Sequence, residues 1–148
     1  MKKLFIALTL GLATMAYAHD EGHGPKLADT GKFGGLVSAV VLKSQAKLGA
    51  QATLLHKAEL VRSADGTVRV YLYDTSMKPI DLKSFDARGS ALLITSVKKK
   101  SKESSFALEL KEGAFVGTMP KPASKPYNID VTLKIEGKDL LSAFDNLD

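Results

Sequence analysis

Three histidines are the residues of this 148-residue chain whose type and spacing best suit chemistry. His19 and His23 lie in the run His-Asp-Glu-Gly-His-Gly, and His56 lies in a more apolar stretch. Neutral imidazole nitrogens are good ligands for Cu(II), Ni(II) and Zn(II). Asp20 and Glu21 add two carboxylates to the same run. The pattern therefore predicts a site for a divalent transition metal.

The first 18 residues predict a secretory signal peptide. Lys2 and Lys3 precede an apolar run over residues 4–15, and alanines at positions 16 and 18 match the pattern that signal peptidase reads. The predicted mature chain begins at His19 and, in a bacterium, resides in the periplasm. The apolar run is too short and wrongly flanked for a membrane span. No later run approaches the length of a span, so we expect no membrane insertion after cleavage.

Cleavage before His19 would strengthen the predicted metal site. The α-amine and the imidazole of His19 would then chelate one ion, with His23 and a neighbouring carboxylate completing the shell. His56 becomes a third nitrogen ligand if the N-terminal arm folds back onto its strand. The alternative is a polar arm whose histidines bind nothing, with His56 partly buried and bonded to a neighbour.

Motifs for catalysis are missing from the sequence. The run His-Asp-Glu-Gly-His does not fit a zinc protease, because the glutamate does not follow the first histidine directly. There is no Gly-x-Ser-x-Gly, phosphate loop or cofactor fingerprint. The chain has no cysteine, which excludes thiol catalysis and suits a periplasmic domain without disulfides. We therefore expect a protein that is not an enzyme.

Length and charge limit the possible partners. Removal of 18 of the 148 residues leaves 130, enough for one domain with its own core. The mature chain would carry 19 Lys and Arg against 16 Asp and Glu, a formal charge of +3. This excess is too small to indicate a nucleic-acid partner.

Short strand-like runs separated by turn residues make up most of the chain after a Gly-rich arm at residues 19–35, which we expect to be mobile. The segment 43–51 is either a helical turn or a loop, and residues 140–144 fit a strand or a helix. The pattern predicts one all-β domain over residues 36–148, a small Ig-like antiparallel β-sandwich of seven or eight strands. The predicted strands are Leu36–Leu42, Ala52–Arg62, Thr67–Asp74, Gly89–Val97, Ser105–Leu110, Ala114–Thr118 and Tyr127–Ile135.

A hairpin over residues 54–80 is the central element of this domain. Its turn at Asp65-Gly66 has the glycine that tight turns favour. Alternation places His56 and Glu59 on opposite faces of the first strand. In the second strand, Val68, Val70 and Leu72 are predicted to point inward, and Arg69, Tyr71 and Tyr73 outward. The outward side chains form either a binding platform or cross-strand pairs.

Lysines gather at residues 98–102, where Lys98, Lys99, Lys100 and Lys102 surround one serine. Such a run is typical of a solvated hairpin loop. The alternative interpretation is a contact with anionic polymers of the cell envelope.

Four short motifs resemble a known family: Gly34-Gly35, Glu59-Leu60-Val61, residues 70–74 (Val-Tyr-Leu-Tyr-Asp) and Lys78-Pro79. They are similar to those of small periplasmic β-domains found alone or at the N-terminus of membrane-fusion-type metal efflux adaptor proteins. The resemblance covers roughly residues 33–145. It implies a β-domain with a role related to metal efflux. The chain departs from the family in having Phe33 where a histidine precedes the Gly-Gly pair, and in the spacing of His56 to Glu59.

Two functions follow as hypotheses. The first is an exported periplasmic protein that binds Cu, Ni or Zn as an accessory of metal efflux or homeostasis, with an efflux or envelope protein as partner. The second is a non-catalytic envelope protein-interaction module without a metal site, which contacts its partner through a sheet edge or the tyrosine face.

Overall fold

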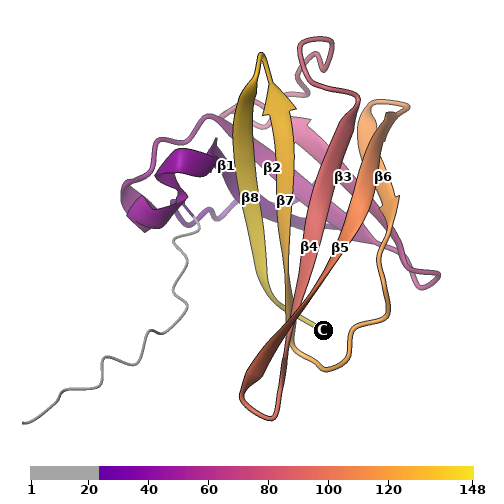
Figure 1. The fold of residues 1–148 in the computed structure, drawn as a ribbon. Helices are drawn as coiled ribbons and strands as arrows, with labels where there is room; N and C mark the ends of the chain where they lie inside the picture. Colours follow the sequence, from indigo (N-terminus) through magenta and orange to yellow (C-terminus); the bar gives the residue numbers. More distant parts are fainter. Residues whose placement is uncertain (1–23) are drawn as a thin grey trace, which may run out of the picture.

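Eight antiparallel strands form the fold of residues 24–148, the part of the chain that the computed structural model describes (Figure 1). The predicted signal peptide and the run from His19 to His23 lie outside the described residues. A 3-10 helix, η1 (Lys43–Gln51), follows the first strand. No helix within residues 24–148 is long and apolar enough to cross a membrane. The strands are β1 (Leu36–Leu42), β2 (His56–Arg62), β3 (Thr67–Tyr73), β4 (Arg88–Val97), β5 (Lys100–Lys111), β6 (Ala114–Thr118), β7 (Tyr127–Ile135) and β8 (Lys138–Leu147).

The strands close into a barrel in the order β1-β2-β3-β6-β5-β4-β7-β8, with β8 pairing back to β1. The prediction of an all-β, antiparallel domain is confirmed, but the prediction of a two-layer sandwich is wrong. Closure depends on Val41 facing Leu141 and Leu42 facing Leu140 across β1 and β8. Sandwiches and barrels share the same alternation of apolar residues, so only the pairing of the first and last strands distinguishes them.

Apolar side chains on the inner faces of the strands fill the barrel. Val68, Val70 and Leu72 of β3 are buried there, as the alternation predicts. Residues 140–144 belong to β8, which forms a continuous ladder with β7 from Leu133↔Leu140 to Ile129↔Phe144. This pairing decides between strand and helix for the C-terminal segment, because both spacings put apolar residues on one face.

The described part of the N-terminal arm, residues 24–35, packs on the outside of the barrel. Leu27 joins Ala39 and Val41 of β1 in a small apolar cluster, together with Ala46 of η1. The expectation of a mobile arm is therefore wrong for these residues. The arm has no periodic pattern because it binds the barrel mainly through backbone N–H groups, which almost any residue type supplies.

Candidate functional site

A buried carboxylate, Glu59 of β2, holds the arm against the barrel. Its Oε1 accepts hydrogen bonds from the backbone N–H of Phe33 (2.7 Å) and Gly35 (2.9 Å). Its Oε2 accepts one from the N–H of Lys32 (2.8 Å) and one from the hydroxyl of Tyr73 (2.7 Å). Glu59 is 0 % exposed although it points away from the barrel core. Four donors occupy the roughly four lone-pair sites of the carboxylate, so Glu59 acts as a clamp.

The electrostatics of this clamp fix its protonation state. Burial alone would raise the pKa of Glu59, but the Tyr73 hydroxyl and the N–H groups of Gly35, Phe33 and Lys32 together lower it. Burial, and then the Glu59 carboxylate, raise the pKa of Tyr73. Glu59 is therefore ionised and Tyr73 protonated at neutral pH. Each charge state is the one that the hydrogen bonds require.

An ion pair ties the arm down a second time. Nζ of Lys57 lies 2.7 Å from Oδ2 of Asp29, and the Lys57 side chain is almost fully buried. Lys57 and Glu59 lie on the same outer face of β2. The arm is thus held by charged groups at two points of one strand.

The outward tyrosines do not form a platform. Tyr73 points away from the core as predicted, but it is only 2 % exposed because the arm and Glu59 cover it. The ring of Tyr71 stacks on Phe33, with ring centroids 4.1 Å apart. The second hypothesis also predicted a partner contact through a sheet edge. In the closed barrel, each strand already pairs with two neighbouring strands.

His56 is the one predicted metal ligand within residues 24–148. It pairs with Val40, a core residue, so its ring lies on the inner side of the barrel, 6.1 Å from the ring of Phe85. Its Nδ1 is buried and has no hydrogen-bond partner among the described residues. Burial lowers the pKa of His56, partly offset by the charge of Asp74. His56 is therefore a neutral imidazole at pH 7.

The other predicted ligands, His19, Asp20, Glu21 and His23, lie outside the described residues. Gly24, the first described residue, lies beside Ala39 and Val41 on the outer side of β1. The described chain therefore approaches the face of the sheet opposite to the ring of His56. Within residues 24–148, no group of three or more His, Cys, Asp and Glu side chains is placed to hold a metal ion.

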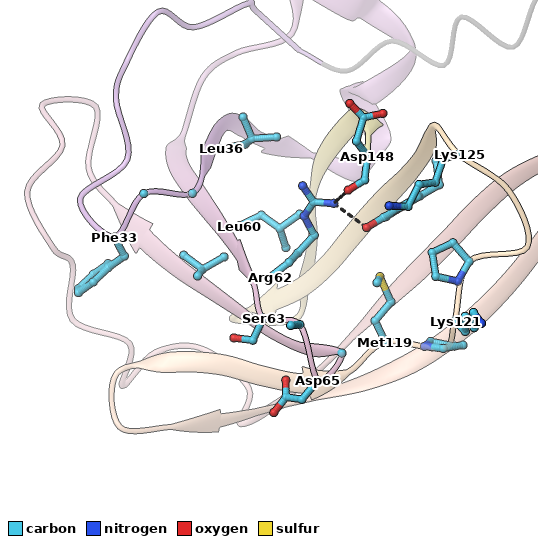
Figure 2. A pocket seen from close by; sticks show the side chains of 18 residues that line it. Phe33, Leu36, Leu60, Arg62, Ser63, Asp65, Met119, Lys121, Lys125 and Asp148 are labelled. Carbon is cyan, nitrogen blue, oxygen red and sulfur yellow. Dashed lines mark hydrogen bonds between the residues drawn. The ribbon is translucent and has the colours of Figure 1, made fainter.

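A cleft of about 780 Å³ lies at the end of the barrel where β1 and β7 begin (Figure 2). One part of its wall is apolar and another part is charged. The view shows Phe33 and Leu36 on one side of Arg62, with Lys125 and Asp148 on the other. Phe33 and Leu36 are 58 % and 49 % exposed, which is unusual for such large apolar side chains. The other residues named in Figure 2 are Leu60, Ser63, Asp65, Met119 and Lys121.

Arg62, at the end of β2, is the polar centre of this cleft. Its Nη1 donates to the hydroxyl of Tyr127 (2.5 Å) and to the backbone oxygen of Asp148 (3.0 Å). The guanidinium carbon lies 5.5 Å from the centre of the Tyr127 ring, a cation–π distance. Among the described residues, the side-chain hydrogen bonds of Arg62 both leave from Nη1, so Nε and Nη2 retain donor capacity. Contacts with Tyr127 and Asp148 thus hold the guanidinium in place.

Sequence reasoning missed this cleft. Arg62 lies about sixty positions before Lys121 and Lys125, and a hydrogen bond from the N–H of Met119 to the oxygen of Gly66 (2.9 Å) brings the two segments together. In the sequence, the Pro- and Lys-rich stretch 119–125 predicts only an extended loop, because its prolines cannot donate to a strand ladder.

The fold and the cleft define a small eight-stranded antiparallel β-barrel with a clamped N-terminal arm and a ligand-sized cleft at one end. No family model, no curated protein and no solved structure matches the chain. The resemblance to small periplasmic β-domains therefore stays a prediction from four motifs.

Proposed function

We propose that this protein is an exported, non-catalytic binding protein whose ligand site is the cleft around Arg62. The observation that carries the proposal is the fixed guanidinium beside an exposed apolar wall. Residues 1–18 support export to the periplasm, because they match a signal peptide.

The chemistry of the cleft selects a class of ligand. Arg62, Lys121 and Lys125 supply positive charge, against Asp65 and Asp148 on the rim. Oδ1 of Asp65 accepts the N–H of Thr67 (2.8 Å), which fixes the turn at the rim. The volume lies within the range of pockets for small organic ligands. An organic anion with an apolar body satisfies both parts of the wall.

Arg62→Gln is expected to weaken the binding of such a ligand about tenfold or more. A hydrogen bond to a charged group is worth roughly 1.5–3 kcal/mol, and glutamine keeps some donor capacity but no charge. The fluorescent probe 11-(dansylamino)undecanoate combines a carboxylate with an apolar body, so its emission measures the affinity. Its neutral methyl ester is expected to bind wild type and variant alike.

The matched control is Arg69→Gln, since Arg69 is an exposed arginine on β3 that does not line the cleft. It should leave the affinity for the carboxylate unchanged. Equal binding of the probe by wild type and Arg62→Gln, or equal loss of the acid and the ester, would contradict the proposal.

A second candidate function is the binding of Cu, Ni or Zn by His19 and His23, in an accessory role in metal efflux or homeostasis. One observation favours it: the arm is anchored on the barrel from Gly24 onward. The predicted ligands would therefore adjoin a fixed point of the fold. An efflux or envelope protein would be the partner in this role.

Calorimetric titration of the chain beginning at His19 with Cu(II), Ni(II) and Zn(II) tests the second candidate. We expect one strong site for at least one of these ions, and its loss in the double variant His19→Ala, His23→Ala. His56→Ala distinguishes metal binding by the arm from metal binding by the barrel, because it removes the single histidine of residues 24–148. This variant should bind the metal as wild type does. Mass spectrometry of the exported protein checks the mature N-terminus. No heat of binding, or binding that the double variant retains, would contradict metal binding by the arm.

A further inference from the structure

Lysines crowd the tip of the β4–β5 hairpin, which projects beyond the barrel (Figure 1). The ladder of β4 with β7 ends at Thr95, and the ladder of β5 with β6 begins only at Glu109, so neither neighbour accompanies the tip. The four lysines at the tip are exposed: Lys98, Lys99, Lys100 and Lys102. Glu103 is the nearest acidic residue on the same hairpin.

The tip is a tight turn that holds its lysines in place. Val97 pairs with Lys100, and the two residues between them have left-handed φ angles of 50° for Lys98 and 64° for Lys99. Asn-Gly adopts this turn with much less strain than two lysines, which also repel each other. The sequence thus places charge where the turn alone would favour other residues.

A second basic segment belongs to the same end of the barrel. The hydroxyl of Ser124 donates to the backbone oxygen of Ser96 (2.9 Å), which ties the loop 119–126 to β4 next to the hairpin tip. This loop carries Lys121 and Lys125, both exposed. We call the six lysines of the hairpin tip and this loop the basic end. Val97 adds a large apolar side chain, 38 % exposed, beside the lysines of the tip.

We propose that the basic end docks on an anionic phospholipid surface, with the hairpin tip as the first contact. Because the lysines share one projecting tip, they can contact a flat anionic membrane at the same time. Each lysine near such a surface increases the binding affinity roughly fivefold. An exposed valine among lysines favours a lipid interface over a soluble polyanion, because the apolar side chain enters the headgroup layer. The proposal does not depend on a ligand in the Arg62 cleft.

Vesicle sedimentation tests this inference. The chain from His19 to Asp148 is used, because the apolar run 4–15 would itself bind lipid. At about 0.1 M salt, we expect binding to phosphatidylcholine vesicles that contain about 30 mol% phosphatidylglycerol and none to pure phosphatidylcholine. Replacing the four lysines of the tip by glutamine should weaken binding at least tenfold.

The matched control has the same net charge. It replaces Lys43, Lys83, Lys134 and Lys138, four exposed lysines near the opposite end of the barrel, by glutamine. This variant should bind the anionic vesicles within about twofold of wild type. Equal loss in both variants would show a response to overall charge and would overturn the proposal. So would binding to heparin without binding to vesicles, which would indicate a soluble polyanion.

Discussion

Glu59→Gln is expected to lower the free energy of unfolding by about 3 kcal/mol at neutral pH. The carboxylate accepts three backbone N–H groups and the Tyr73 hydroxyl in a fully buried place. A glutamine side chain has the same shape, but its NH₂ group would face at least one of these donors. The hydrogen bonds would also lose their charge assistance. The arm, residues 24–35, would therefore detach first.

Urea unfolding followed by far-UV circular dichroism measures this change. Glu109→Gln is the matched control, because Glu109 is an exposed residue of β5 whose carboxylate forms an ion pair with Lys111 (3.1 Å). It should change stability by less than about 0.5 kcal/mol. Limited proteolysis reports the arm separately, with faster cleavage between residues 24 and 35 in Glu59→Gln. A variant as stable as the control would show that Glu59 is not the clamp.

The clamp also sets a pH dependence. The pKa of Glu59 is lower in the folded protein than its ordinary value of 4.5. The ionised clamp therefore stabilises the fold fully above about pH 4.5, and this stabilisation is lost as the pH falls through the lower, folded pKa. The difference in the free energy of unfolding between wild type and Glu59→Gln should therefore decrease in that acid range. A difference that stays constant across the range would contradict an ionised Glu59.

Gly35→Ala is expected to destabilise the protein by at least about 2 kcal/mol. A Cβ at this position would overlap with the backbone oxygen of Leu60 and lie 2.9 Å from Cγ of Glu59. The backbone of Leu60 is part of β2 and cannot move aside as the end of a flexible side chain can. The arm would move outward, and the N–H of residue 35 would leave Oε1 of Glu59.

Gly34→Ala provides the comparison within the same Gly-Gly pair. Gly34 has a φ of 76°, but a Cβ there would meet nothing within 4 Å. Only the left-handed backbone is then strained, at about 1 kcal/mol. Urea unfolding of both variants should rank Gly35→Ala as clearly less stable. The reverse order would mean that turn geometry, not contact with β2, requires the pair.

Alternation in the sequence was enough to predict several elements. Val68, Val70 and Leu72 were assigned to the core from their spacing alone, and the turn at Asp65-Gly66 followed from residue type. Such signals are local, because side-chain period and turn preference depend on neighbours in the chain. Closure of the barrel and the strand character of residues 140–144 depend on pairing with β1 and β7, which no local pattern encodes.

The candidate sites divide in the same way. His19 and His23 could be proposed as metal ligands because they are neighbours in the sequence, and their prediction still rests on that spacing. The assignment of Glu59 to the face opposite to His56 was correct, but its burial could not be foreseen, since it comes from donors 24 to 27 residues away in the arm. Tyr73 was likewise assigned the right face, and its hydrogen bond to Glu59 on β2 fits the cross-strand alternative, but its burial under the arm could not be foreseen.

The sequence by itself determined the strand content, the direction of most side chains and the chemistry available in the histidine run. Only the tertiary structure decided that the sheet closes, that the arm is clamped by Glu59 and that Arg62 meets Lys121 and Lys125 around one cleft. The physical reason is distance along the chain. Contacts between remote segments are made by backbone groups and single charged side chains, and these leave no periodic trace in the sequence.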